Sequence, residues 1–170
     1  LPPAEISSIH YRAQDVRPGG MFVAIAGQTV DGHDFCGQAL ENGAAALVVQ
    51  KMPEVHLFSV DNPKLANIGP ILVQAPDTRI ALADLAACMY NHPSAHMHLI
   101  AITGTNGKTT VAYLIEHILL KAGLKTGVIG TIDYRYAGKT YPNPMTTPES
   151  LDLQRILADM HQSGVTHVVM

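Results

Sequence analysis

The sequence has few charged residues and no excess of positive charge. Lysine, arginine, aspartate and glutamate make up 15% of its 170 residues, and the formal net charge is −3. A protein that binds nucleic acid as its main partner usually carries a basic surface, so this composition argues against that class. Hydrophobic residues make up 47% of the chain, which is enough for a core and excludes a disordered protein.

Long hydrophobic runs are also missing. No run approaches the roughly 20 apolar residues that a membrane-spanning helix needs. Residues 1–5, Leu-Pro-Pro-Ala-Glu, lack the basic start and apolar block of a secretory signal. We therefore expect a cytoplasmic protein without a membrane partner. The sequence does not start with Met, which favours a trimmed chain or an internal start.

Cysteine is scarce, and histidine offers only a weak metal pattern. Cys36 and Cys88 lie far apart without metal-type spacing, which predicts two reduced thiols in a cytosolic protein. His92, His96 and His98 flank a Pro-Ser pair instead of sharing one helix face. They leave two interpretations open, a metal site or a hinge exposed to water, and the spacing favours the hinge.

The most informative stretch of the chain is Gly-Thr-Asn-Gly-Lys-Thr-Thr at residues 104–110. The apolar run 99–103 before it is typical of a buried strand. After it, apolar residues recur at helical spacing until Gly123 supplies a stop signal. These residues are Val111, Leu114, Ile115, Ile118, Leu119 and Ala122. A strand, a glycine-bearing loop and a helix that opens at Lys-Thr together predict a phosphate-binding loop.

The chemistry of this loop follows from the start of the helix. The first N–H groups of a helix lack internal partners, and the helix dipole adds positive charge there. Gly104 and Gly107 let the backbone curl so that N–H groups point at phosphate oxygens. Lys108 would meet the β- and γ-phosphates, and the Thr109 hydroxyl would bind Mg²⁺. The common form of the motif has glycine where Ile102 stands, so a glycine turn that only joins strand to helix is the alternative.

Strands and helices alternate along the chain, which predicts an α/β fold with two domains, 1–95 and 96–170. In the first domain we expect strands at 21–26, 46–49, 57–60 and 71–73, and a helix at 34–42. A second helix, capped by Asp77, would bury Leu82, Leu85, Ala86 and Met89.

The second domain would have a mainly parallel sheet, with strands at 99–103, 126–130 and 165–170. A hairpin over 133–141 would turn at Ala137-Gly138, and a helix starting near Thr147, with Pro148 in its first turn, would bury Leu153, Ile156, Leu157 and Met160.

Residues 103–110 resemble the phosphate loop of the Mur ligase family, the ATP-dependent peptide-bond formers of cell-wall synthesis. Thr146-Thr147-Pro148-Glu149 is similar to the substrate loop of the family members that attach a diamino acid. Three more stretches resemble the same members: 16–24, Asp31-Gly32-His33 with Gly43-Ala44, and 164–170. The matching stretches occur in the same order as in the family and are spread over nearly the whole chain.

The resemblance implies a three-domain enzyme with a P-loop ATPase in the middle. Residues 1–95 would form the N-terminal domain that binds the UDP-substrate, and 96–170 the first part of a truncated central ATP-binding domain. ATP would phosphorylate a carboxylate of UDP-N-acetylmuramoyl-L-alanyl-D-glutamate, and the amine of meso-diaminopimelate or L-lysine would attack the acyl phosphate in peptidoglycan synthesis. ATP and Mg²⁺ are the implied cofactors, the partners are these small molecules, and a monomer is expected.

The resemblance also implies site residues. Lys108 would be catalytic, and Thr109 would bind the metal. ATP would bind Gly104, Thr105, Asn106, Gly107, Lys108, Thr109 and Thr110. The UDP-substrate would bind Tyr11, Ala13, Gln28, Thr29, Val30, Met145, Thr146 and Thr147. Helix capping is the alternative role for the two threonines, and a polar turn is the alternative for 28–32.

Two positions depart from the family pattern, and two other functions stay open. Ala13 stands where the family usually has serine, and Met145 where asparagine often precedes the Thr-Thr pair, so neither side chain donates a hydrogen bond. One alternative is a sister Mur-type ligase with another acceptor, such as the one that adds D-alanyl-D-alanine or one that forms polyglutamate. The other is that the 170-residue chain is a nucleotide-binding module that does not catalyse ligation by itself.

Overall fold

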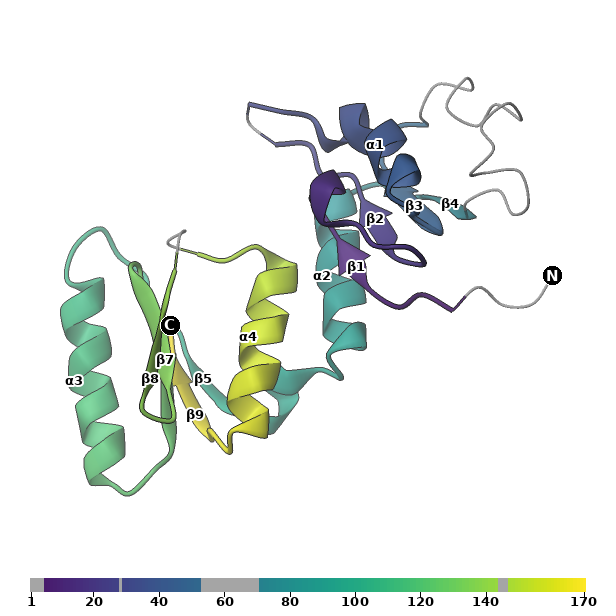
Figure 1. Ribbon diagram of the computed structural model, residues 1–170. Helices are drawn as coiled ribbons and strands as arrows, with labels where there is room; N and C mark the ends of the chain where they lie inside the picture. Colours follow the sequence, from purple (N-terminus) through teal and green to yellow (C-terminus); the bar gives the residue numbers. More distant parts are fainter. Residues whose placement is uncertain (1–4, 28, 53–70, 144–146) are drawn as a thin grey trace. The chain divides into compact units, whose positions relative to one another are not determined.

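The computed structural model describes residues 5–27, 29–52, 71–143 and 147–170. The chain divides into two compact units, Leu1–Leu85 and Ala86–Met170 (Figure 1). Both units are α/β, as the alternation of the sequence predicts. None of the helices in the described ranges is both long and apolar enough to span a membrane.

The first unit contains a four-stranded sheet in which all neighbouring strands are parallel. Its strands are β1 (Ile9–His10), β2 (Met21–Val23), β3 (Ala46–Val49) and β4 (Ile71–Gln74), in that spatial order. The connections include two 3-10 helices, η1 (Ala13–Asp15) and η2 (Gly32–Phe35), and the helix α1 (Cys36–Glu41). Phe22 pairs in register with Leu47, and both are fully buried in a core with Cys36, Ala39 and Leu40.

The helix α2 (Thr78–Met89) begins at the cap that the sequence predicts. The Asp77 carboxylate accepts hydrogen bonds from the N–H groups of Arg79, at 2.8 Å, and Ile80, at 3.0 Å. Leu82 and Ala86 are buried as expected, whereas Met89 is 39% exposed. The prediction of a buried Met89 is wrong because the helix ends there, one turn beyond Ala86.

The second unit contains a five-stranded sheet in the order β5-β9-β6-β7-β8. β5 (His98–Ile100), β9 (His167–Val169) and β6 (Thr126–Ile129) are parallel, and β9 lies between the other two. The hairpin of β7 (Asp133–Tyr136) and β8 (Lys139–Pro142) adds two antiparallel strands. Ala137 and Gly138, with φ of +50° and +75°, form its turn as predicted.

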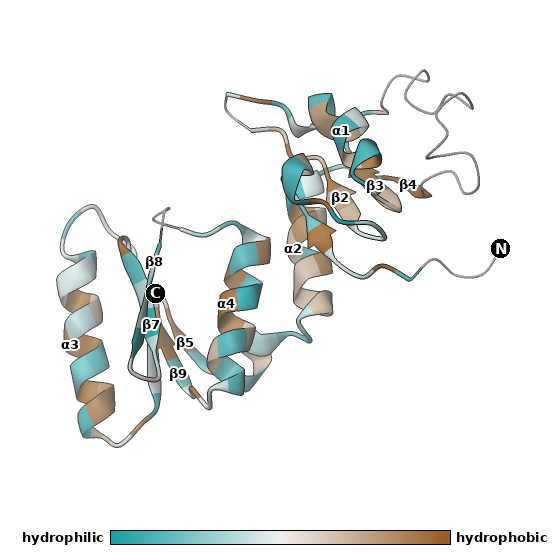
Figure 2. Cartoon of the chain, viewed as in Figure 1, coloured by the Kyte–Doolittle hydropathy of each residue, from teal (hydrophilic) through white to brown (hydrophobic). Residues whose placement is uncertain are grey.

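Two helices cover opposite faces of this sheet (Figure 1). The helix α4 (Ser150–Gln162) packs with Val168 and Ile129, and α3 (Lys108–Lys121) packs with Val169 and Val128. Successive residues of a strand point to opposite faces of a sheet, so Val168 packs in the core under α4 and Val169 in the core under α3. Figure 2 shows that the parallel strands are more hydrophobic than the hairpin. β5 and β9 are largely brown (hydrophobic), whereas the hairpin is largely teal (hydrophilic).

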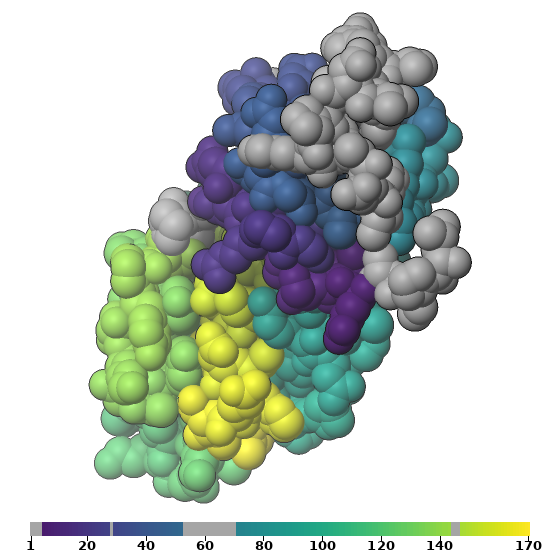
Figure 3. Space-filling view, turned by 45° about the vertical axis from the view of Figure 1, so that its right-hand side comes forward, coloured from purple at the N-terminus to yellow at the C-terminus, as the bar shows by residue number. Residues whose placement is uncertain are grey.

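The helix α4 follows its predicted pattern closely, but it starts later than expected. Ile156, Leu157 and Met160 are buried, and Gly164, with φ of +80°, ends the helix region. The helix begins at Ser150, not near Thr147, because the Glu149 side chain caps it by accepting from the Ser150 N–H. Figure 3 shows the yellow end of the chain, which includes the second half of α4, beside a teal segment, and the 3-10 helix η4 (Pro93–His96) contacts α4.

Only some of the apolar residues that recur at helical spacing in α3 are packed against the sheet. Leu114 and Ile118 are 60% and 65% exposed, and Val111 is 41% exposed. The helix instead packs through Ala112, Ile115 and Leu119. Apolar residues occur on several sides of this helix, so spacing alone could not choose the face that meets the sheet.

Several strand predictions need smaller corrections. β2 ends at Val23, and the predicted helix 34–42 is η2 followed by α1. The expected buried strand 99–103 is β5, where Leu99 is 40% exposed because β5 is the edge strand of the described sheet. The predicted strand 57–60 lies outside the described residues.

Candidate functional site

The loop between β5 and α3 starts at the carboxyl end of a parallel strand. The Met170 N–H donates to the Ile100 carbonyl at 2.9 Å, and the Ile102 N–H donates to the Met170 carbonyl at 2.6 Å. These bonds continue the β5–β9 pairing and fix where the loop leaves the sheet. Ligands of open α/β sheets bind at this carboxyl edge, so the loop lies where such a site is expected.

Two glycines give the loop its curl. Gly104 has φ of +148°, and Gly107, with φ of +80°, is the N-cap of α3. A Cβ on Gly107 would meet no atom within 4 Å, so it is the backbone conformation that calls for glycine there. The Val111 N–H donates to the Gly107 carbonyl at 2.9 Å, which starts the helical hydrogen bonds. The earlier N–H groups of the first turn have no acceptor inside the helix.

The Lys108 side chain folds back over the loop. Its Nζ donates to the Gly104 carbonyl at 2.5 Å, so an ammonium lies beside the curled backbone. A positive group at the N-terminus of a 14-residue helix gives this edge of the unit an attractive field for anions.

A cavity of about 330 Å³ opens beside this loop. It brings together four of the predicted residues, namely Gly104, Lys108, Thr109 and Thr147. The predicted Thr105, Asn106 and Gly107 belong to the loop and Thr110 to the first turn of α3, and the cavity lining does not include them. Its other lining residues are Ile102, Thr103, Ala112, Ile129, Gly130, Thr131, Pro148 and Met170.

The sequence analysis missed the wall of the cavity that contains Gly130 and Thr131. These residues follow β6 directly, at the same edge of the sheet as the phosphate loop. The rule that ligands bind at the carboxyl ends of neighbouring parallel strands could have found them.

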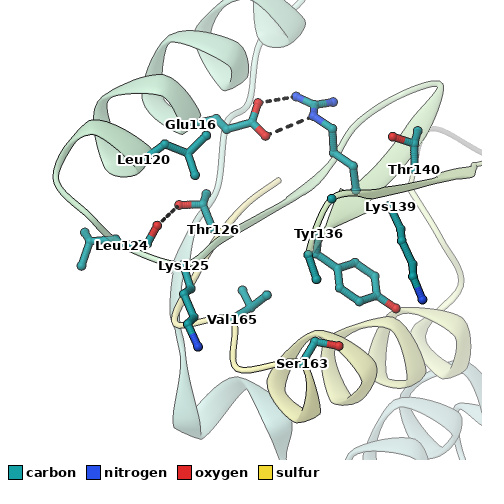
Figure 4. A pocket seen from close by; sticks show the side chains of 13 residues that line it. Glu116, Leu120, Leu124, Lys125, Thr126, Tyr136, Lys139, Thr140, Ser163 and Val165 are labelled. Atoms are coloured by element: carbon teal, nitrogen blue, oxygen red, sulfur yellow. Dashed lines mark hydrogen bonds and ion pairs between the residues drawn. The ribbon is translucent and has the colours of Figure 1, made fainter.

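A larger cavity, of about 570 Å³, lies between the hairpin tip and the ends of α3 and α4 (Figure 4). Lys125 and Lys139 line it together with apolar residues such as Leu120 and Val165. The carboxyl ends of α3 and α4 border it, and these ends carry partial negative charge that opposes anion binding. The smaller cavity is therefore the better candidate for a phosphate site.

The predicted residues of the first unit occupy different environments. The Tyr11 hydroxyl accepts a hydrogen bond from the Arg12 guanidinium at 3.1 Å. Ala13 is 5% exposed in the core, and its carbonyl accepts from the Asn42 side chain at 2.9 Å. Its methyl group is thus used for packing. Thr29 is exposed, and Val30 is 55% exposed.

Tight backbone contacts hold the loop that carries Thr29 and Val30. The Gly27 N–H donates to the Val30 carbonyl, and the Gly32 N–H donates to the Ile25 carbonyl, both at 2.9 Å. A Cβ on Gly32 would lie 2.7 Å from two backbone atoms of Ile25. The loop therefore depends on glycine at its base. The predicted Gln28, Met145 and Thr146 lie outside the described residues.

His33 links the base of this loop to β3. Its Nδ1 lies 2.6 Å from the Asp31 carboxylate, and its Nε2 accepts from the Gln50 N–H at 2.8 Å. Because Nε2 accepts, the ring hydrogen is on Nδ1 and points at Asp31. The backbone and ring hydrogen bonds from His33 lower the pKa of Asp31 below its usual value.

Within the described ranges, no group of three or more His, Cys, Asp and Glu side chains is arranged to hold a metal ion. His96 stacks on His161 with centroids 5.2 Å apart, and His98 stacks on His167 at 4.8 Å. Pro93 is fully buried, whereas His92, His96 and His98 are exposed, as the hinge interpretation expects of them, and the hinge itself stays a prediction. The hydroxyl-bearing Thr109, which lines the phosphate-loop cavity, offers the kind of oxygen that Mg²⁺ prefers.

Comparison with known proteins agrees with this arrangement. Residues 5–90 match the model of the Mur ligase family catalytic domain, and residues 102–170 match the Mur ligase middle domain. The chain is 42% identical over 166 residues to UDP-N-acetylmuramoyl-L-alanyl-D-glutamate--2,6-diaminopimelate ligase of Geobacillus thermodenitrificans, and 39% identical to the ligase of that name from Geobacter metallireducens. These matches cover 98% of the chain but only 31% and 30% of the two relatives.

Solved structures show the same fold. A structure of a UDP-N-acetylmuramoyl-L-alanyl-D-glutamate--2,6-diaminopimelate ligase superposes with a TM-score of 0.72 at 23% identity, over 96% of this chain and 31% of the other. The MurF ligase of Thermotoga maritima in complex with ADP superposes with a TM-score of 0.54 at 24% identity, over 96% and 31% of the two chains. The two family models together account for both units, and the chain belongs to the Mur ligase family.

Proposed function

We propose that the protein carrying this chain is an ATP-dependent ligase that adds diaminopimelate to UDP-N-acetylmuramoyl-L-alanyl-D-glutamate. The observation that carries this proposal is the identity of about 40% to ligases of that name along 98% of the chain. Because the chain spans about 30% of those relatives, the activity is proposed for the whole protein. The predicted boundary at 95/96 between a UDP-substrate domain and an ATP-binding domain is part of the proposal.

Charge governs the first step of the proposed reaction. A substrate carboxylate attacks the γ-phosphate of ATP, which releases ADP and leaves an acyl phosphate. Both reactants are anions, so catalysis depends on neutralising and aligning them. In this proposal, Lys108 leaves the Gly104 carbonyl and binds the β- and γ-phosphates, while the N–H groups of Gly104, Thr105, Asn106, Gly107, Thr109 and Thr110 surround the phosphates.

The remaining site residues are assigned in the same proposal. The Thr109 hydroxyl would hold Mg²⁺, which supplies further positive charge to the phosphates. Thr146 and Thr147 would bind the acceptor beside the phosphate loop, and Thr147 lines the cavity with Lys108. Tyr11, Ala13, Gln28, Thr29 and Val30 would bind the uridine end, with the Ala13 backbone acting in place of its buried methyl group.

The experiment is a reconstitution of the full-length protein with ATP, Mg²⁺ and either the UDP-muramoyl dipeptide or the UDP-muramoyl tripeptide. Diaminopimelate, L-lysine and D-alanyl-D-alanine are offered separately, and phosphate release and product mass are measured. We expect release that requires both the dipeptide and diaminopimelate. A preference for D-alanyl-D-alanine with a tripeptide acceptor would instead indicate a sister ligase.

The 170-residue chain can be tested separately for nucleotide binding. We expect ATP with Mg²⁺ to raise its thermal unfolding midpoint, and Lys108→Ala to remove that shift. Lys139→Ala, on the hairpin, is the matched control because it removes one lysine outside the phosphate-loop cavity. Amide formation by the 170-residue chain itself would contradict the expectation that it only binds nucleotide.

A further inference from the structure

Asn143 is an unusual residue in the second unit because its polar side chain is buried. Its exposed fraction is 7%, and Thr78 is the only other buried polar residue within the described ranges. A buried amide is costly unless it is hydrogen-bonded, so its partners indicate what it stabilises.

Asn143 binds one short turn through both its side chain and its backbone. Its Nδ2 donates to the Gly130 carbonyl at 2.7 Å, and its N–H donates to the Ile132 carbonyl at 2.8 Å. The Gly130 N–H donates to the Asp133 carbonyl at 2.7 Å within the same turn. Asn143 directly follows β8, so the end of the hairpin holds the residues that follow β6.

The turn held in this way contributes a wall of the phosphate-loop cavity. Gly130 and Thr131 line the cavity, together with Lys108 and Thr109 from α3. Ile132, the next residue, is 77% exposed and outside the lining. Thr131 is thus the hydroxyl-bearing residue of the turn that lines the cavity.

We propose that Asn143 is a positioning residue that holds the turn bearing Thr131, and that the Thr131 hydroxyl donates a hydrogen bond to an anionic oxygen of the bound substrate. The proposal rests on the proposed ligase function and deepens it. A hydroxyl that faces a phosphate or carboxylate oxygen forms a charge-assisted hydrogen bond. Its strength depends on placement, and Asn143 supplies the placement.

The test is a double-mutant cycle in the full-length protein. Thr131→Val removes the hydroxyl at nearly constant volume, and Asn143→Ala removes the amide that holds the turn. We measure kcat and KM for dipeptide-dependent phosphate release, the Kd of ADP with Mg²⁺, and the unfolding midpoint. Thr140→Val, on β8 and outside the phosphate-loop cavity, is the matched control and leaves these constants unchanged.

We expect each single substitution to lower kcat/KM about tenfold, the effect of losing a hydrogen bond to a charged group. The double variant is expected to be no worse than Asn143→Ala alone, because both changes remove the same contact. Losses that multiply to about a hundredfold would overturn the proposal. The proposal would also be overturned if Thr131→Val had the same kcat/KM as Thr140→Val. If Asn143→Ala fails to fold, this comparison of the two threonine variants tests the role of the Thr131 hydroxyl by itself.

Failure of the proposed ligase function would look different. In that case the unmodified protein would release no phosphate in response to the dipeptide. The same cycle measured as Kd for ADP with Mg²⁺ then decides the inference. Non-additive losses of affinity would support the Asn143 assignment for a nucleotide site, and unchanged affinity in both single variants would overturn it.

Discussion

The guanidinium of Arg135, on β7, binds the carboxylate of Glu116, on α3, through two hydrogen bonds of 3.1 Å and 2.6 Å. The same guanidinium donates to Asp133 at 3.0 Å and lies 4.2 Å from the centroid of the Tyr113 ring. The hydrogen bond to Glu116 is the main cause that raises the pKa of Arg135. The hairpin is therefore fastened to the helix whose first residue is Lys108.

Arg135→Lys should destabilise the second unit by about 1–3 kcal/mol, because lysine cannot reproduce the paired bonds to a partly buried carboxylate. The side chains of Arg135 and Glu116 are only 19% and 16% exposed. Urea denaturation measures the change in the free energy of unfolding.

Arg155→Lys is the matched control for this prediction. Arg155 is 45% exposed, and its ion pairs with Asp152 and Asp159 are long, at 3.6 Å and 3.9 Å. Its replacement should cost less than about 1 kcal/mol. Equal losses for the two arginine variants would show that the paired geometry at Glu116 has no special effect.

Gly107→Ala and Gly138→Ala form a second matched pair. The two glycines have φ of +80° and +75°, and a Cβ at either position would meet no atom within 4 Å. Both variants should lose about 1–2 kcal/mol of stability, the cost of the left-handed conformation. Only Gly107→Ala should also weaken ADP binding, because only Gly107 belongs to the phosphate loop.

Calorimetric titration with ADP and Mg²⁺ checks the binding part of this prediction. The stability losses are compared by urea denaturation without nucleotide. If Gly107→Ala binds ADP as tightly as Gly138→Ala does, the curl at the start of α3 is not needed for the ligand.

Local signals in the sequence were sufficient for several elements. The cap at Asp77, the turn at Ala137-Gly138 and the strand Ala46–Val49 each depend on neighbouring residues, and the structure has all three. The loop between β5 and α3 belongs in this group as a local structure, because its glycines, lysine and threonine are contiguous, whereas its binding of phosphate stays a prediction. Such features can be predicted because their hydrogen bonds and dihedral angles are set within a few residues.

The features that sequence reasoning missed depend on contacts between distant residues. Thr131 reaches the cavity because β6 lies beside β9, and Asn143 holds the turn across 13 positions of the chain. The packed face of α3 depends on which residues meet β6 and β9, and its pattern offers apolar residues on more than one side. These relationships follow from tertiary packing, which residue spacing alone does not determine.

The two cysteines should differ in reactivity. Cys36 is fully buried, and burial raises the pKa of its thiol to about 11. Cys88 is exposed on α2. Because the thiolate is the reactive form, a thiol reagent at pH 8 should label Cys88 rapidly and Cys36 only after unfolding.

Mass spectrometry of the labelled chain checks this prediction. We expect one label in buffer and two in 6–8 M urea, which is a denaturing range for small domains. Cys88→Ser is the control, and its native form should take up no label. Rapid labelling of Cys36 in the native Cys88→Ser variant would contradict the tight packing of α1 on the sheet.

Asp31→Asn should give a pH-dependent loss of stability in the first unit. The folded-state pKa of Asp31 lies below its usual value, so the folded chain favours the ionised carboxylate. That stabilisation is present above the unfolded-state pKa, near 4, and disappears as the pH falls through the lower folded-state pKa. The variant should therefore be less stable than the unmodified chain at pH 7, and the difference should shrink between pH 4 and pH 3 or below.

Urea denaturation of both chains at pH 7, 5, 4 and 3 measures this difference. Asp34→Asn is the control, because it removes one charge from the 3-10 helix that Asp31 caps, and the Asp34 carboxylate makes no hydrogen bond to a described residue. A constant gap between Asp31→Asn and the unmodified chain at every pH would mean that the carboxylate charge is unimportant. The link from Asp31 through His33 to the Gln50 N–H would then depend on the shape and hydrogen-bonding atoms of the side chain and not on its charge.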